Sequence, residues 1–162
     1  MTLPKSLHSD SPDHAGLRIP PPLIFLIAAA VGVLVHWIRP VSVRPDGWAF
    51  WLLGTAITAT AIALAAWAGL TLRRHDTAVY PWHSTTAIVT TGPYTFSRNP
   101  MYLAFALFQL GLGLWTDRLA VVLMVIPAIL ATNRFIIARE EAYLERKFGE
   151  TYLDYARSVR RW

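Results

Sequence analysis

The chain has 162 residues, of which 54% are hydrophobic and only 15% are charged, and its net charge is +5. Soluble domains carry about 25% charged residues, whereas here long uncharged runs alternate with crowded charges, which is the pattern that a bilayer imposes. The sequence lacks cysteine, which excludes disulfides, thiolate metal sites and a cysteine nucleophile, and its basic residues flank apolar runs, which favours anionic lipid headgroups over nucleic acid as partners.

The first part of the chain predicts a polar arm followed by two membrane helices. Residues 1–19 are polar and without periodicity, so we expect a flexible arm. Residues 20–38 and 48–72 are uncharged apolar runs long enough to span a bilayer, and together they form a two-helix region at 20–72. Prolines at the start of the first run suit the first turn of a helix, and tryptophans toward both ends of the second suit interfacial anchors.

The region 73–162 begins with a polar connector at 73–99, which is too long to be simple linkage and predicts a functional loop. Two further apolar runs follow at 101–116 and 119–138. They are separated by two residues only, so we expect an antiparallel transmembrane hairpin. The predicted fold is therefore an all-α polytopic membrane bundle of about four transmembrane helices.

The tail at 139–162 continues the last helix, which Gly149 should end, and a short amphipathic helix should follow. Its Tyr152 and Tyr155 are three residues apart on one face and are interpreted as interfacial anchors. The turns at 39–47 and 116–118 hold three arginines, whereas the opposite side holds eleven or twelve basic residues. This asymmetry predicts that both termini are cytoplasmic, and that connector and tail meet over the same helix ends.

One polar cluster lies where the connector enters the third apolar run. Asn99 followed by Pro100 predicts a helix start, with Asn99 as N-cap. The free amides of Met101 and Tyr102, with Arg98 beside them, would favour an anion. A capped helix with a snorkelling arginine explains the same residues without a ligand.

The second cluster is Glu140-Glu141 near the end of the last run. Adjacent acids at a helix C-terminus oppose the helix dipole, so we expect a partner for them. Arg134 lies seven residues before Glu141 and should share its helix stripe. A solvated helix end, with Glu141 paired to Arg146 or Lys147, is the alternative.

Several motifs together resemble a known superfamily. They are Gly92-Pro93-Tyr94, Arg98-Asn99-Pro100-Met101-Tyr102, Glu140-Glu141, Phe148-Gly149-x-x-Tyr152-x-x-Tyr155 and Val159-x-Arg161-Trp162. In order and spacing they resemble the isoprenylcysteine carboxyl methyltransferase and phospholipid methyltransferase superfamily, integral membrane enzymes that use S-adenosylmethionine. The resemblance covers residues 73–162.

The resemblance implies a methyltransferase that moves a methyl group from S-adenosylmethionine to a lipophilic acceptor, with the bilayer as its other partner and no metal. Glu141 and Arg134 are the catalytic candidates. The resemblance implies these cofactor-binding residues: Thr86, Ala87, Ile88, Val89, Gly92, Tyr94, Arg98, Asn99, Pro100, Met101, Tyr102 and Glu140.

Two positions depart from the family pattern. Asn99 stands where many relatives have histidine, so no proton transfer is assigned to it. Ile136 stands where the isoprenylcysteine enzymes have an arginine that holds the substrate carboxylate, so the acceptor stays open among phospholipid amines, prenylated thiol acids, small thiols and isoprenoids. A small transporter and a structural membrane subunit are the alternatives from other classes. Transport predicts ionisable groups at mid-membrane depth, and only His36 and Arg134, near helix ends, lie within the apolar runs.

Overall fold

The computed structural model describes residues 20–43, 48–77 and 85–162, and within these ranges every regular element is helical. The helices α1 (Pro21–Ile38), α2 (Trp48–Arg74) and α3 (Pro100–Trp115) confirm the first three predicted runs to within two residues. The fourth run begins as predicted at Leu119, and its helix continues to Phe148, as expected from Gly149 at its end. The arm at 1–19 and part of the connector, including His83, lie outside the described residues.

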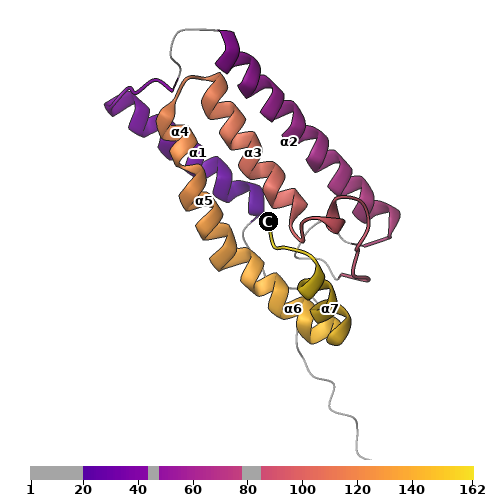
Figure 1. Cartoon of the computed structure of the whole chain (residues 1–162). Coiled ribbons are helices and arrows are strands. Elements are labelled where there is room, and N and C mark those ends of the chain that lie inside the picture. Colours follow the sequence, from indigo (N-terminus) through magenta and orange to yellow (C-terminus); the bar gives the residue numbers. More distant parts are fainter. Residues whose placement is uncertain (1–19, 44–47, 78–84) are drawn as a thin grey trace, which may run out of the picture.

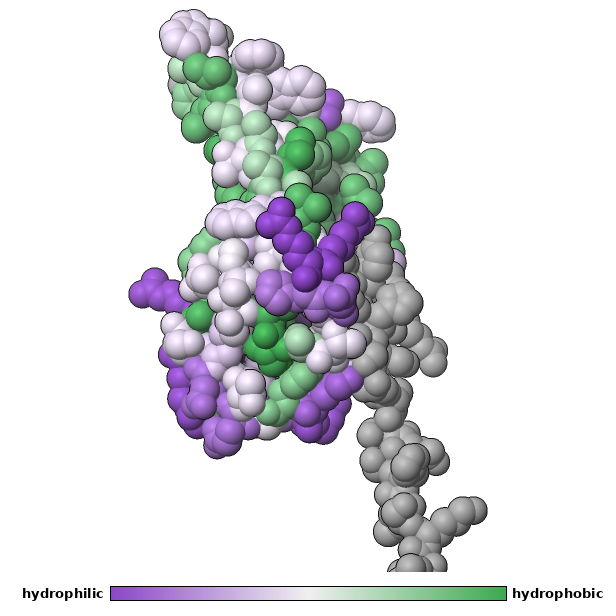
Figure 2. Space-filling model, turned by 90° about the vertical axis from the view of Figure 1, so that its right-hand side faces the viewer, coloured by the Kyte–Doolittle hydropathy of each residue, from purple (hydrophilic) through white to green (hydrophobic). Residues whose placement is uncertain are grey.

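The helices run side by side as an elongated bundle (Figure 1). α2 packs along most of α3, whereas α1 lies mainly against the last helix and contacts α3 less. Three helices are long and apolar enough to cross a membrane, and α3 is a shorter apolar helix among them. Figure 2 shows hydrophilic residues gathered toward one end of the molecule and hydrophobic ones above, so the predicted membrane bundle is confirmed.

The α2–α3 contact depends on small residues, as expected for helices that pack within a bilayer. A Cβ atom built on Gly111 would lie 2.4 Å from Thr58 Oγ1 and 3.0 Å from the Gly54 carbonyl oxygen. On the other face of α3, a Cβ on Gly113 would lie 2.9 Å from the Val122 backbone nitrogen. The backbones therefore approach too closely at Gly111 and Gly113 for larger residues.

The last helix is interrupted twice. α4 (Leu119–Leu123) and α5 (Val125–Thr132) meet at Met124, just before Pro127, whose ring clashes with the carbonyl four residues earlier. A π-helical turn, η2 (Asn133–Ile137), then leads into α6 (Ala138–Phe148). At 1.5 Å per residue the whole helix is about 45 Å long, more than the roughly 30 Å of hydrocarbon. Its last part therefore projects beyond the apolar layer.

Gly149 ends α6 as predicted, with a φ of 55° that favours glycine. α7 (Glu150–Ser158) is the expected amphipathic helix and folds back beside α6. From α7 the chain returns to the start of α3, and the C-terminus lies beside it (Figure 1). The backbone N–H of Arg98 donates to the Arg160 carbonyl over 2.8 Å, which fixes this return. Two segments about sixty residues apart in sequence are thereby joined.

Candidate functional site

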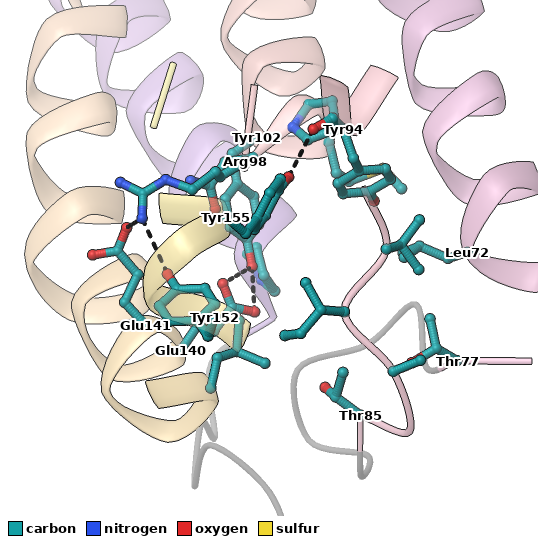
Figure 3. A pocket seen from close by; sticks show the side chains of 18 of the residues that line it. Leu72, Thr77, Thr85, Tyr94, Arg98, Tyr102, Glu140, Glu141, Tyr152 and Tyr155 are labelled. Carbon is teal, nitrogen blue, oxygen red and sulfur yellow. Dashed lines mark hydrogen bonds and ion pairs between the residues drawn. The ribbon is translucent and has the colours of Figure 1, made fainter. Parts of the chain in front are cut away.

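A cavity of about 350 Å³ lies at the polar end of the bundle, between the connector, the start of α3 and helices α6 and α7. This volume falls within the range of roughly 300–1,000 Å³ that small-molecule sites occupy. Figure 3 shows one wall formed by acids, arginine and tyrosines, and an opposite wall formed by Leu72, Thr77 and Thr85. The cavity is therefore charged and aromatic on one side, and on the other it is lined by uncharged side chains, which include Leu72 and Val89.

Glu141 is the centre of an ion-pair cluster on the polar wall. Its carboxylate pairs with Arg161 and lies 3.3 Å from the Arg98 guanidinium. The same Arg98 nitrogen donates to the Tyr152 hydroxyl over 3.2 Å. Arg98 Nε is buried and has no hydrogen-bond partner among the described residues. The Arg98 side chain is 15% exposed and lines the cavity, where a guanidinium favours an anionic group of a ligand.

Glu140 has a different partner. The buried hydroxyl of Tyr102, on α3, lies 2.9 Å from both carboxylate oxygens of Glu140. No salt bridge to Glu140 is found within residues 20–43, 48–77 and 85–162. Its neighbour Glu141, in contrast, is shared by two arginines. Glu140 is therefore the carboxylate whose charge is left for a cationic or hydroxyl-bearing ligand in the cavity.

The C-terminal segment Arg160–Trp162 closes the site from behind. The Arg161 carbonyl accepts from Ser97 Oγ at 3.2 Å and from Asn99 Nδ2 at 3.0 Å. Trp162 Nε1 donates to Asn133 Oδ1 over 2.9 Å, at the π-helical turn. The segment thus ties the start of α3 to the last helix and holds Arg161 against Glu141.

Asn99 is the N-cap residue of α3 as predicted, with Pro100 at the first helical position. Its side chain makes no capping hydrogen bond, because it is engaged with the Arg161 carbonyl. The Asn99 backbone N–H donates instead to Ser97 Oγ over 3.0 Å. Asn99 therefore acts here as a link to the C-terminal segment.

The connector supplies the apolar wall. Val89 is buried and packs with Ala68 and Tyr94, and Leu72 and Met101 lie against this group. The connector is fastened by Thr86, whose backbone N–H donates to Thr77 Oγ1 over 3.1 Å, and whose hydroxyl donates to the Asp76 carbonyl over 2.9 Å. These contacts present residues 87–89 to the cavity.

Three tyrosines surround the cavity near α7. The Tyr155 hydroxyl donates to the Tyr94 carbonyl over 2.8 Å, which joins α7 to the 3-10 turn η1 (Gly92–Thr95). Burial raises the pKa of Tyr152 and of Tyr155 to about 12. Burial also raises the pKa of Tyr94. All three phenols are therefore neutral hydrogen-bond donors near pH 7.

The structure brings most of the sequence-predicted site residues to this one cavity. Those that line it are Ala87, Ile88, Val89, Tyr94, Arg98, Asn99, Pro100, Met101, Tyr102, Glu140 and Glu141. Thr86 and Gly92 support the walls rather than line them. Gly92 has a φ of 60°, and a Cβ there would lie 2.8 Å from Thr71 Oγ1. Arg134 is exposed on η2 and is not a lining residue.

Sequence reasoning missed part of the lining, above all Tyr152 and Tyr155, which were interpreted as interfacial anchors. Both are buried in the site. Their place in the Phe148-Gly149-x-x-Tyr152-x-x-Tyr155 motif was the available signal. Further lining residues without such a signal are Pro21, Pro22, Leu72, Thr77, Thr85, Phe105 and Leu144. In the part of the chain that is described, no group of three or more His, Asp or Glu residues is arranged to hold a metal ion.

Comparison with known proteins identifies related sequences. The sequence model of a family described as phospholipid methyltransferase matches residues 49–151, well over half of the chain. An uncharacterized protein of Haemophilus influenzae is 50% identical over 62 residues, which are 38% of this chain and 98% of that protein. No solved structure matches.

Two further relatives are larger proteins. The cobalt-zinc-cadmium resistance protein CzcN of Cupriavidus metallidurans is 37% identical over 70 residues, 43% of this chain and 32% of that protein. The nickel-cobalt-cadmium resistance protein NccN of Alcaligenes xylosoxydans xylosoxydans is 35% identical over 72 residues, 44% of this chain and 33% of that protein. The chain thus spans about a third of the length of these two relatives.

Proposed function

The chain belongs to the phospholipid methyltransferase family, and from this premise we propose that it transfers a methyl group from S-adenosylmethionine to a lipophilic acceptor at the membrane face. The observation that carries the proposal is the convergence on one cavity of the Arg98 guanidinium, the Glu140 carboxylate, which has no arginine partner among the described residues, and an apolar strip. The family match also favours an enzyme over a transporter or a structural subunit.

The cavity's polar groups suit the chemistry of this cofactor. Arg98 lines the cavity, and its guanidinium can donate to the cofactor's carboxylate. Glu140, held by Tyr102, can accept from the cofactor's ammonium or ribose hydroxyls and stabilises positive charge nearby. Ile88 and Val89 offer an apolar surface for the adenine. The three parts of the cofactor thus correspond to three parts of the cavity wall.

When bound, the cofactor supplies an electrophilic methyl group, which passes to a heteroatom of the acceptor as the carbon–sulfur bond breaks. The chain's own contribution is alignment and exclusion of water, since holding reactants in line lowers a barrier by roughly 7–11 kcal/mol. Tyr94, Tyr152 and Tyr155 enclose the polar wall. Pro22 and Phe105 border the cavity on the side of α1 and α3, where a lipophilic acceptor can enter from the bilayer.

The geometry favours a positioning role for Glu141 over the proton-accepting role expected from sequence. Its carboxylate is shared by Arg98 and Arg161, and both of its oxygens are engaged by these two arginines. We propose that Glu141 orients Arg98 toward the ligand. Arg134 is exposed and outside the lining, so the geometry gives its catalytic role no support.

We further propose that this end of the bundle faces the cytoplasm, with both termini on that side. The basic residues of the connector and tail support this orientation, because positively charged loops are retained on the cytoplasmic side. Cysteine-scanning accessibility at exposed positions of the tail and of the opposite turns tests the orientation directly, because the natural chain has no cysteine.

Glu140→Gln tests the assignment of the cavity. Losing one charge-assisted hydrogen bond removes about 1.5–3 kcal/mol, so calorimetry on the purified protein in lipid nanodiscs should show S-adenosylmethionine binding weakened about 10- to 150-fold. Glu145→Gln is the matched control, since Glu145 is exposed on the same helix and does not line the cavity. Unchanged affinity in Glu140→Gln contradicts the cofactor assignment.

Methyl transfer itself is tested separately. Membranes containing the protein are incubated with S-adenosylmethionine labelled in its methyl group, and the lipids are then extracted and separated. Label in a lipid fraction that is lost with Glu140→Gln and kept with Glu145→Gln supports the proposed function. Absence of labelled lipid, with intact cofactor binding, contradicts the lipophilic acceptor.

A further inference from the structure

The π-helical turn η2 changes which side chains of the last helix face the bundle. Before it, Val125, Ala128 and Thr132 are buried and share one helix face. In η2 the Ala138 backbone N–H donates to the Asn133 carbonyl, five residues earlier, whereas an α-helix bonds residues four apart. The turn therefore holds about one residue more than an α-helical turn, and α6 is rotated by about 100° relative to an uninterrupted α-helix.

This rotation determines where Glu141 lies. Glu141 follows Thr132 by nine residues, or about two and a half turns of an α-helix, so an uninterrupted helix would place it on the opposite face. Ile137 follows Thr132 by five residues and would lie about 140° away from it. In the structure Ile137 is fully buried, and Glu141 lines the cavity and is 19% exposed. The extra residue of η2 accounts for both positions.

Trp162 joins η2 to the C-terminal segment. Its Nε1 donates to Asn133 Oδ1 over 2.9 Å, and its side chain packs against the buried cluster of Tyr102, Ile136 and Ile137. Asn133 is the first residue of η2 and Ile137 is the last. Trp162 is thereby fixed to the turn that sets the rotation of α6.

The residue before Trp162 binds the acid that this rotation brings into the site. Arg161 pairs with Glu141, and Arg98 lies 3.3 Å from the same carboxylate. Figure 3 shows Glu141 directed toward Arg98. The segment itself is fixed by the hydrogen bond from Asn99 Nδ2 to the Arg161 carbonyl. Two neighbouring residues of one segment therefore hold the π-helical turn and the acid that it places.

We propose that η2 sets the rotation of α6 at which Glu141 reaches Arg98, and that Trp162 and Asn133 are positioning residues whose hydrogen bond holds this rotation. The proposal rests on the proposed function in taking S-adenosylmethionine as the ligand of the cavity. Neither Trp162 nor Asn133 is among the described residues that line the cavity, so both act on the cofactor through Glu141 and Arg98. Single π-helical turns within α-helices are frequent at functional sites.

Two changes of length within η2 test the rotation. Phe135 is 54% exposed and outside the cavity lining. Its deletion leaves Glu141 eight residues after Thr132, so an ordinary α-helix then restores nearly the observed face. Insertion of an alanine between Arg134 and Phe135 instead turns α6 by about a further 100°. The deletion should therefore be tolerated and the insertion should not.

Cross-linking without cofactor measures this difference. The natural chain has no cysteine, so Glu141→Cys and Arg161→Cys introduce one pair, at positions whose side chains now form an ion pair. In lipid nanodiscs, a short bifunctional thiol reagent should join them in the chain of natural length and in the Phe135 deletion, but at least about tenfold less in the insertion. Equal yields in the two length variants overturn the role of η2.

Trp162→Phe tests the hydrogen bond, because phenylalanine keeps an aromatic ring and has no N–H. The loss of one neutral hydrogen bond predicts S-adenosylmethionine binding about 2- to 12-fold weaker by calorimetry. Asn133→Leu removes the acceptor and should give a similar loss, and the double variant should lose no more than either single one. Trp115→Phe is the matched control, since Trp115 is exposed on α3 and outside the cavity lining.

Glu141→Gln separates positioning from general stability. If Trp162 acts through Glu141, Trp162→Phe should change cofactor affinity by less than about twofold once residue 141 is glutamine. A purely structural role predicts that the two losses add, and additive losses overturn the assignment of Trp162.

The two kinds of readout keep this inference separable from the proposed function. Failure of the natural protein to bind S-adenosylmethionine contradicts the proposed function, and the cross-linking yields then still decide whether η2 sets the rotation. Cofactor binding by the natural protein, together with equal cross-linking of the two length variants, contradicts this inference alone.

Discussion

The polar cavity and the contact between α2 and α3 are neighbours, but they are assembled in different ways. The polar cavity is formed by segments distant in sequence, which are joined by side-chain hydrogen bonds such as that from Trp162 to Asn133. The α2–α3 contact is formed by two helices whose spacing depends on small residues such as Gly111. The first is therefore sensitive to individual polar contacts, and the second to the volume of residues between helices.

The largest expected effect comes from a change in helix spacing. Gly111→Val should place its side chain against Thr58 and the α2 backbone, and such overpacking is unfavourable by about 1–3 kcal/mol or more. We expect a clearly lower apparent unfolding temperature in detergent, measured by circular dichroism.

Gly69→Ala is the matched control for this change. A Cβ at Gly69 would have Met101 Cε at 3.7 Å as its only close neighbour, which is an ordinary contact. Its unfolding temperature should therefore stay near that of the natural protein. If Gly111→Val is as stable as Gly69→Ala, the contrast between the two regions does not hold.

An intermediate effect is expected at the ion-pair cluster. Glu141→Gln removes the charge that Arg98 and Arg161 share. Because Glu141 acts on the ligand through Arg98, cofactor affinity should fall by about 0.5–1.5 kcal/mol, or about 2- to 12-fold. Because a positioning residue does not exchange protons with substrate, the pH profile of kcat should keep its shape, as measured with labelled cofactor at saturation.

A large fall in kcat with a changed pH profile would instead support the proton-accepting role that was expected for Glu141 from the sequence. Removing a general base lowers kcat by about 10²–10⁴ and abolishes the corresponding limb of the pH profile. Glu145→Gln, on the exposed side of α6, controls for the loss of one negative charge near the site.

The smallest effect is expected at Arg134, which is exposed on the π-helical turn and outside the cavity lining. Surface substitutions of this kind usually change stability by no more than about 0.5 kcal/mol. Arg134→Ala should therefore leave cofactor affinity and kcat within about twofold of the natural protein, measured by calorimetry and by transfer of labelled methyl groups. A tenfold fall in kcat would show that the sequence-based role for Arg134 holds in a conformation other than this one.

The class of the protein and the positions of its helices could be predicted from the sequence alone. Uncharged runs of sufficient length specify membrane helices, because no other open structure satisfies its backbone groups in lipid. Local signals were equally reliable: Pro100 opens α3, and Gly149 ends α6. The motifs around Arg98 and Glu140 also indicated which residues share one end of the bundle, and the structure brings them together. These features depend on composition and on neighbours along the chain.

The contacts that enclose the site could not be predicted from the sequence and were found only in the folded chain. Residues 160–162 return to Asn99 and to Asn133 in the π-helical turn η2, and Tyr155 is buried against η1. These contacts join positions roughly 30 to 60 residues apart. In the sequence, Gln109 is a single polar residue in an apolar helix. Only the structure shows that its amide nitrogen donates to the Val121 carbonyl of α4, and that its amide oxygen has no partner among the described residues. Such contacts depend on which helix faces are adjacent, and helical periodicity alone does not specify that.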